Sequence, residues 1–279
     1  MIGSIKQLRR YAGLLAAFMY SGANFILAFT LQRHTSAEDF GIYAIVQVVL
    51  QFGVSLSNAV LCAPLVLSLR KSDSPALPSF MRINTIFCVA GATIVSIAIS
   101  FWGAGLEIGL AAGTLALLSW SRWFLRSVEQ ARHNFMASVR ADILYWFVVL
   151  VTALTVLIRG DFAVNKVLWI QILGNAAAFL AIGSGIRNWC SFGVGASSEP
   201  FVISLRRHGA WATLGVVTTE ATANAHAWIV GFFLGPKAFA PIAAVTLFFR
   251  PVLIASQALA QYERPRMAKA IEARDCGDL

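Results

Sequence analysis

The hydrophobic positions of this chain form long apolar stretches that are separated by short polar segments. An α-helix of about 20 apolar residues crosses a bilayer, and membrane β-strands would need an alternating pattern that these stretches lack. The pattern therefore predicts an all-α, polytopic integral membrane protein with about eight transmembrane helices. The eight stretches cover residues 11–31, 40–69, 80–102, 106–125, 143–158, 167–186, 208–234 and 238–260.

The composition supports the membrane class. Of the 279 residues, 58% are hydrophobic and 13% are charged. This balance is typical neither of soluble globular domains nor of collagen-like, disulfide-rich or disordered chains. The four cysteines have no CxxC spacing, so we interpret them as unpaired thiols. The first stretch is too long for the core of a signal peptide and is followed by no convincing cleavage site, so we interpret it as a span.

The basic residues are distributed unevenly between the two sides of this predicted topology. With the N-terminus inside, only Arg33, Arg159, Lys166 and Lys237 of the 22 Lys and Arg residues fall in outer segments, and Arg250 lies within a stretch. Positive residues accumulate in the cytoplasmic segments of membrane proteins. We therefore expect a multi-pass protein with both termini in the cytoplasm, in which the net charge of +9 sets orientation and does not attract nucleic acid.

An internal repeat indicates two lobes. Three short motifs of the first 65 residues recur at an offset of about 200 residues, which is typical of parallel repeats in transporters. The pairs are Leu8-Arg9-Arg10 with Leu205-Arg206-Arg207, Phe40-Gly41-Ile42-Tyr43-Ala44 with Phe239-Ala240-Pro241-Ile242-Ala243, and Pro64 with Pro265. We expect a first six-helix lobe in residues 1–190 and, in residues 200–279, two helices and a cytoplasmic tail of an incomplete second lobe.

The polar residues give no enzyme signature. The segment 193–198 lacks the Gly-Lys-Ser or Gly-Lys-Thr ending of a phosphate-binding loop, and the four histidines lack metal-ligand spacing. We therefore expect neither an enzyme nor a cofactor. Two ionisable residues instead fall at mid-membrane depth, Glu220 in the seventh stretch and Arg250 in the eighth, where an unpaired charge is costly.

Glu220 and Arg250 have two interpretations. In the functional one, Glu220 binds a coupling proton or cation, and Arg250 attracts an anionic group such as a phosphate. In the structural one, the two residues neutralise each other and fix helix packing. The neighbouring polar stripes have a similar alternative, because amides often join membrane helices. The candidates for a substrate or ion pathway are Glu220, Asn224, Arg250, Asn24, Gln51 and Asn58.

Two further segments favour a structural role. Gly105, Gly109 and Gly113 form a ridge of small residues that predicts a packing face for the fourth span. The segment 122–142 carries charges at helical spacing, and we interpret it as helix extensions on the cytoplasmic side, with a lipid-headgroup or partner site as the alternative.

Several motifs resemble a known family. They are Phe40-Gly41-Ile42-Tyr43-Ala44, Asn58-Ala59, Pro64-Leu65, the Arg-rich segment between spans four and five, and Arg264-Pro265-Arg266-Met267-Ala268. They are similar to the polysaccharide transporter branch, with its O-antigen flippase-like (Wzx-like) proteins, of the multidrug/oligosaccharidyl-lipid/polysaccharide exporter superfamily.

The resemblance implies a two-lobe carrier of twelve or more helices in the bacterial cytoplasmic membrane. Such a carrier moves lipid-linked oligosaccharide to the outer leaflet by alternating access, with an ion gradient in place of ATP. Its partners would be membrane lipid, the lipid-linked glycan, and a second-half polypeptide or further copies of the chain. Arg250 suits the pyrophosphate by chemistry, although no matched motif assigns it. The alternatives are an ion-coupled exporter of small molecules or drugs, and an inactive truncated remnant or scaffold.

Overall fold

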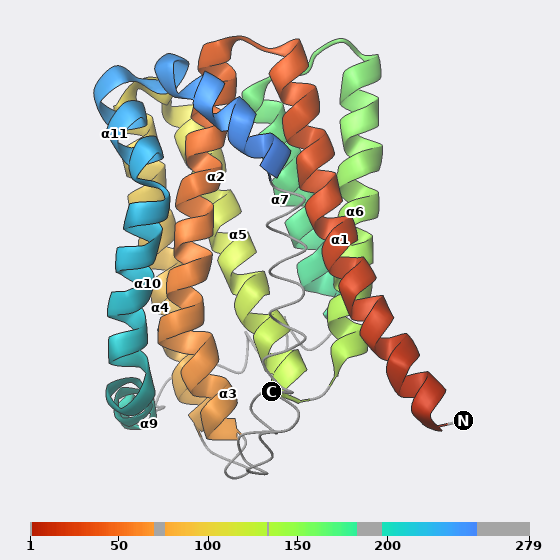
Figure 1. Cartoon of the computed structure of the whole chain (residues 1–279), viewed down its shortest axis with the longest axis vertical. Coiled ribbons are helices and arrows are strands. Elements are labelled where there is room, and N and C mark those ends of the chain that lie inside the picture. The colour runs from red at the N-terminus through yellow and green to blue at the C-terminus, as the bar shows by residue number, and fades with distance from the viewer. Residues whose placement is uncertain (1, 70–75, 133, 183–196, 250–279) are drawn as a thin grey trace.

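A computed structural model of the chain describes residues 2–69, 76–132, 134–182 and 197–249. Over these ranges the regular structure is helical, with no strand among the described residues. Figure 1 shows the helices as an elongated bundle in which the long helices run alternately up and down. Five helical segments are long and apolar enough to cross a membrane, so the chain is a candidate multi-pass membrane protein. They are Ala37–Val66, Leu77–Ala104, Leu106–Ala131, Met136–Ile158 and Val164–Ala181.

The elements follow one another with short connections. In chain order they are α1 (Ile2–His34), α2 (Ala37–Ser57), η1 (Asn58–Cys62), α3 (Ala63–Leu69), α4 (Ala76–Ile99), η2 (Ser100–Ala104), α5 (Leu106–Ala131), α6 (Phe135–Ile158), α7 (Val164–Ala181), α9 (Glu199–Ser204), η3 (Leu205–Gly209), α10 (Ala210–Ala223), α11 (Ala225–Leu234) and the helix Pro236–Phe249, where η marks a π-helical segment.

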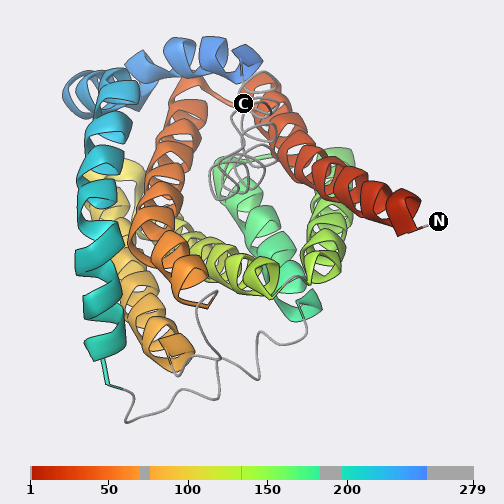
Figure 2. The same ribbon diagram turned by 60° about the horizontal axis from the view of Figure 1, so that its bottom comes forward.

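The second to sixth apolar stretches each correspond to one of these five segments, and the first lies within α1. The seventh is not one continuous helix. It is divided at Asn224 into α10 and α11, of 14 and 10 residues. Of the eighth stretch, the part up to residue 249 belongs to the helix Pro236–Phe249, which lies across the upper end of the bundle (Figures 1 and 2). The rest of that stretch lies outside the described residues.

Local chemistry explains the tight connections between the long helices. The Ser36 hydroxyl accepts a hydrogen bond from the Asp39 amide at 3.1 Å and so caps the start of α2, as a serine at this position commonly does. Between α4 and α5 the chain reverses at Gly103 and Gly105, whose φ angles are 98° and 86°. Only glycine adopts this left-handed backbone without strain.

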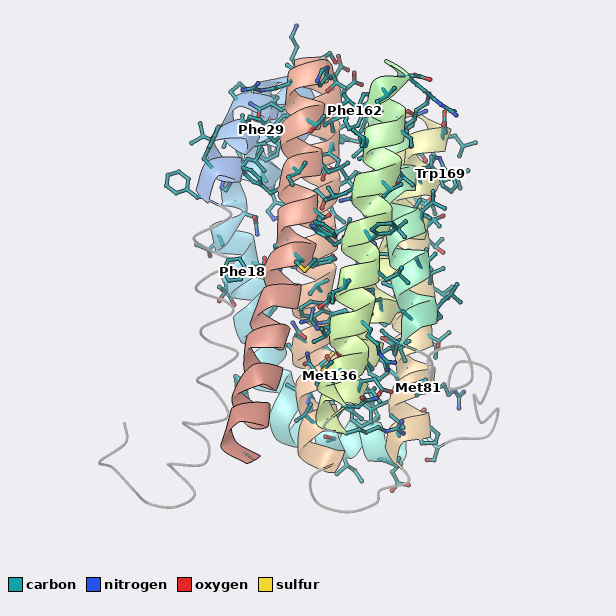
Figure 3. All side chains as sticks on the ribbon, turned by 90° about the vertical axis from the view of Figure 1, so that its right-hand side faces the viewer. Phe18, Phe29, Met81, Met136, Phe162 and Trp169 are labelled. Carbon is teal, nitrogen blue, oxygen red and sulfur yellow. The ribbon has the colours of Figure 1, made fainter. Side chains whose placement is uncertain are left out.

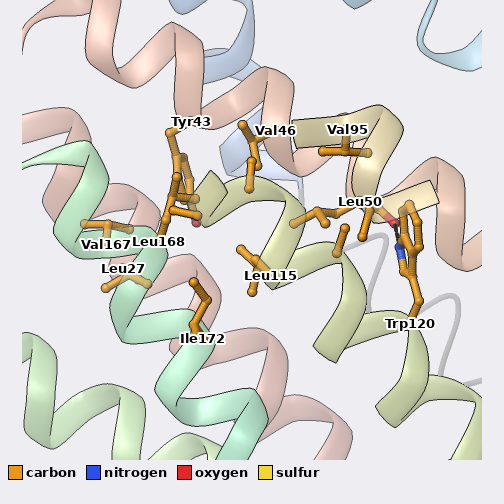
Figure 4. Close-up of a cluster of buried hydrophobic side chains, with 14 of the residues drawn as sticks. Leu27, Tyr43, Val46, Leu50, Val95, Leu115, Trp120, Val167, Leu168 and Ile172 are labelled. Atoms are coloured by element: carbon orange, nitrogen blue, oxygen red, sulfur yellow. Dashed lines mark hydrogen bonds between the residues drawn. The ribbon is translucent and has the colours of Figure 1, made fainter. Parts of the chain in front are cut away.

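The helices pack closely because small residues on two of them accommodate the large Trp120 ring of a third. The Trp120 indole of α5 donates to the Leu50 carbonyl of α2 at 3.0 Å (Figure 4). Gly53 of α2 and Gly91 of α4 make room for the ring, because a Cβ there would lie 2.1 and 2.5 Å from it. Small residues let membrane helices approach closely.

The predicted glycine ridge is a packing face at two of its three positions. A Cβ on Gly109 would lie 1.9 Å from the Ser100 hydroxyl, and one on Gly113 would lie 2.7 Å from the Ala92 carbonyl. Both α5 glycines therefore face the α4–η2 segment at close range. Gly105 instead forms the turn before α5.

The outer surface of the bundle is apolar. Large exposed side chains cover α4 and α6, among them Ile94 at 66% and Leu154 at 57% relative exposure. On the face drawn in Figure 3, the half-exposed Phe18, Met136 and Trp169 belong to the same surface. Contiguous apolar exposure of this extent is unusual in a soluble monomer and suits contact with lipid.

Candidate functional site: a polar cavity in the bundle

A network of uncharged polar side chains links four helices inside the bundle. Asn24 of α1 accepts hydrogen bonds at its Oδ1 from the Tyr145 hydroxyl of α6, at 2.7 Å, and from the Gln171 amide of α7, at 2.8 Å. Gln47 of α2 donates to the Gln171 Oε1 at 3.0 Å. The Gln171 amide also donates to the Tyr43 hydroxyl at 3.3 Å. These bonds satisfy groups that lipid could not solvate.

The network surrounds a cavity of about 70 Å³. One water needs only about 10–15 Å³ by this kind of measure, so the cavity has room for several water molecules. Its surface is formed by three hydroxyls, five amides and three apolar side chains. The lining residues are Tyr20, Asn24, Gln47, Leu50, Gln51, Val54, Leu115, Ser119, Tyr145, Gln171 and Asn175.

A charged cluster adjoins the cavity. The Arg122 guanidinium of α5 donates to the Asp142 Oδ1 of α6, at 2.5 Å, and to the Asn175 Oδ1 of α7, at 3.1 Å. It also lies between two rings of the cavity lining, 4.6 Å from the Tyr20 centroid and 4.7 Å from the Tyr145 centroid. Arg126 approaches the second oxygen of Asp142 at 3.2 Å. Two arginines therefore share one carboxylate.

The helical part of one sequence-based interpretation is confirmed, because α5 continues to Ala131 and α6 already begins at Phe135, beyond the apolar stretches themselves. The sequence did not indicate the burial of the Arg122 and Asp142 side chains, which are only 6% and 1% exposed. Arg132 and Arg140 are exposed as expected. Arg122 can be buried because Asp142 of α6 neutralises its charge and Asn175 of α7 accepts a further hydrogen bond. Tyrosine rings of α1 and α6 cover the planar guanidinium.

A smaller cavity of about 20 Å³ continues from the first toward the arginines. The two share the lining residues Tyr20, Val54 and Ser119, and the smaller one adds Arg122, Trp123 and Arg126. The uncharged network and the charged cluster thus form one continuous polar region within the apolar bundle.

The predicted residue Glu220 lies at a different interface, between α10 and α2. Its carboxylate accepts from the Ser55 hydroxyl at 2.6 Å and from the Asn224 amide at 2.9 Å. Glu220 and Asn224 are therefore brought together, with a hydroxyl of α2 as the third member. Arg250 lies outside the described residues, so its pairing with Glu220 stays a prediction.

The other predicted residues take two positions. Asn24 and Gln51 line the same cavity, although they come from different helices. Asn58, in the π-helical η1, accepts from the Trp123 indole at 2.6 Å, and Trp123 lines the smaller cavity. The structure does not bring Glu220 and Asn224 into the lining of either cavity.

The sequence-based prediction missed Arg122, Asp142, Tyr145, Gln171 and Asn175. Two signals could have found four of them, whereas none pointed to Tyr145. Gln171 and Asn175 are amides four residues apart in an apolar stretch, the same signal that singled out Gln51. Arg122 and Asp142 are opposite charges flanked by apolar residues at neighbouring ends of consecutive stretches.

The described residues contain no group of three or more His, Cys, Asp or Glu side chains that could hold a metal ion. Comparison of the chain with protein-family models, curated proteins and solved structures finds no match. A function must therefore be argued from the sequence motifs and from the geometry of the polar region.

Proposed function

We propose that this chain is a membrane transporter of the polysaccharide biosynthesis type. It would translocate lipid-linked oligosaccharide across the bacterial cytoplasmic membrane by alternating access. Two things support the proposal: the motif resemblance of the sequence, and a polar cavity between α1 and four helices of membrane-spanning length.

The polar cavity beside Arg122 is the observation that carries the proposal. Ionisable and amide groups inside membrane helices are costly and usually mark a pathway for substrate or ions. Here groups from five helices, α1, α2, α5, α6 and α7, converge on one space. Helix association alone requires only isolated small or polar contacts between pairs of helices.

The cavity is too small for the proposed substrate, so the transport cycle must include a wider conformation. A space of about 70 Å³ accommodates water but no oligosaccharide. The described conformation is therefore a closed one, and substrate entry requires the helices around the cavity to separate. A ligand that binds the open form better would shift the population toward it.

Each predicted residue has a role in this proposal. Asn24 and Gln51 form part of the cavity surface, and Asn58 holds Trp123 beside the arginines. Glu220, with its partner Asn224, binds the coupling proton or cation. Arg250 meets the pyrophosphate of the lipid carrier.

Transport in reconstituted vesicles tests the proposal. The purified chain is placed in liposomes that contain a fluorescent polyprenyl-pyrophosphate oligosaccharide, and an impermeant quencher reports the fraction in the outer leaflet over time. We expect faster exchange than in protein-free liposomes, accelerated by an imposed ion gradient. We expect Glu220→Gln to lower the gradient-driven rate at least tenfold, because the amide cannot carry the coupling charge.

The matched control is Thr222→Val on the same helix. The Thr222 hydroxyl is exposed and bonds only to the Thr218 carbonyl of its own helix, at 2.8 Å. This variant should transport like the parent chain. Exchange no faster than in protein-free liposomes would refute the proposal, and efflux of a cationic dye without glycan movement would instead support a small-molecule exporter.

A further inference from the structure

We propose that the cavity between α1, α2, α5, α6 and α7 is a binding subsite for an uncharged, hydroxyl-bearing group, specifically a neutral sugar unit of the transported glycan. This inference rests on the proposed function and names the part of the substrate that the cavity recognises.

The lining has the chemistry of a polyol site. The hydroxyls and amides of its polar residues include both donors and acceptors, as sugar hydroxyls require. The tyrosine rings and three aliphatic side chains supply apolar surface for the C–H faces of a sugar ring. No carboxylate and no lysine is present among the lining residues.

The neighbouring charge argues against a cation in this cavity. Arg122 bonds to the lining residue Asn175 and lies against the rings of the lining residues Tyr20 and Tyr145. Arg126 is the second cation, and Asp142 neutralises only one positive charge of the pair. A metal or ammonium ion in the cavity would thus meet net repulsion from this cluster. An anion would be attracted to the arginines, but both of them line the smaller cavity and neither lines this one.

Two lining residues make no side-chain hydrogen bond within the described part of the chain. Within the described part of the chain, the Gln51 amide and the Tyr20 hydroxyl have no hydrogen-bond partner. By contrast, Asn24, Tyr145 and Gln171 bond to one another. Gln51 is also an exposed member of the lining, so it lies at the mouth of the cavity. The network therefore forms the wall of the cavity, and Gln51 with Tyr20 is positioned to receive the sugar.

The cavity's volume limits the contact. About 70 Å³ has room for one or two hydroxyl groups or a hydroxymethyl group, while the rest of the sugar remains at the mouth. In the closed form the subsite would therefore hold an edge of one sugar unit, and the full ring would enter when the helices separate.

Binding of simple glycosides to the purified chain tests this subsite without any transport. The chain is held in a detergent without a sugar headgroup, and its unfolding midpoint is measured by intrinsic tryptophan fluorescence. The probes are methyl glucoside and methyl N-acetylglucosaminide at up to 100 mM. We expect at least one probe to raise the midpoint by about 2–4 °C with a saturating concentration dependence.

The variants separate binding from the general stabilisation that sugars give as solutes. Gln51→Leu keeps the size of the side chain and removes its amide, and Tyr20→Phe removes only the hydroxyl. Each should abolish the saturable part of the shift while leaving the midpoint without sugar nearly unchanged. Thr93→Val is the control, because the exposed Thr93 hydroxyl bonds only to the Val89 carbonyl of its own helix. This variant should retain the full shift.

Each outcome bears on the subsite separately from the transport proposal. A shift with sodium chloride or sodium phosphate but not with the glycosides would overturn the sugar assignment in favour of an ion site. A glycoside shift that persists in Gln51→Leu and Tyr20→Phe would also overturn it. A saturable shift that both variants abolish supports the subsite even if vesicle transport fails. Glycan transport that Gln51→Leu and Tyr20→Phe leave unaltered would refute the subsite and leave the transport proposal standing.

Discussion

Asp142 is the residue on which the charge balance of the polar region depends. Its carboxylate is 1% exposed and serves both Arg122 and Arg126. Removing one partner of a buried ion pair costs about 3–5 kcal/mol, because the remaining charge stays desolvated. We therefore expect Asp142→Ala to lower the unfolding midpoint of the purified chain by about 10 °C, as measured by tryptophan fluorescence during heating.

The control for Asp142 is an ion pair at the surface. Asp161 pairs with Lys166, and their side chains are 64% and 37% exposed. Exposed pairs contribute about 0–1 kcal/mol, so Asp161→Ala should leave the midpoint almost unchanged. Equal midpoints for the two variants would show that the buried cluster does not depend on its charge pairing.

Arg122 shows why the sequence alone could not identify every charged residue of the polar region. Arg122 and Glu220 are both charges within apolar surroundings, but only Glu220 was recognised, because it lies at the centre of its stretch. Arg122 lies near the end of a stretch, where a long side chain commonly reaches the interface. Its position between two tyrosine rings of different helices depends on tertiary packing, which periodicity does not contain.

At the scale of elements, apolar length predicted the second to sixth helical stretches well because a bilayer imposes a minimum length on each span. It failed at the seventh, where Asn224 was interpreted as a residue of a polar stripe. The Asn224 amide instead donates to the backbone and carboxylate of Glu220, four residues earlier, and α10 ends there. Asparagine often competes with the backbone in this way.

The contact between α4 and α5 gives a prediction at the same scale. A Cβ on Gly113 would lie 2.7 Å from the Ala92 carbonyl and 2.8 Å from the Ser96 Cβ. Because backbone atoms cannot move aside, Gly113→Ala must separate the helices. We expect a loss of stability of about 1–3 kcal/mol, measured as a lower unfolding midpoint.

A glycine-to-alanine substitution at a position with free space around it should not lower the stability. Gly215 lies in α10 with no heavy atom within 4 Å of a Cβ built on it. Gly215→Ala should therefore be neutral or stabilising by up to about 1 kcal/mol, since alanine is the better helix former. If Gly113→Ala were equally harmless, the glycine ridge would not be a close-packed face.

The arrangement of the whole molecule leads to a prediction about its orientation in the membrane. The long helices alternate in direction, so the segment between α5 and α6 and the segment between α6 and α7 lie at opposite ends of the bundle (Figure 1). Arg132 is exposed at the first end and Asp161 at the second. The excess of basic residues predicts that the first end is cytoplasmic.

Cysteine accessibility measures this orientation. In a variant whose four native cysteines are replaced, Arg132→Cys or Asp161→Cys is added, and intact cells are treated with a membrane-impermeant maleimide. We expect Asp161→Cys to react once the outer membrane is permeabilised and while the inner membrane is still intact. Arg132→Cys should react only after the inner membrane is permeabilised as well. Reaction of both positions before permeabilisation would mean that α6 does not cross the membrane. The reverse pattern would place the termini outside and exclude entry of a cytoplasmic glycan from the end where Arg132 lies.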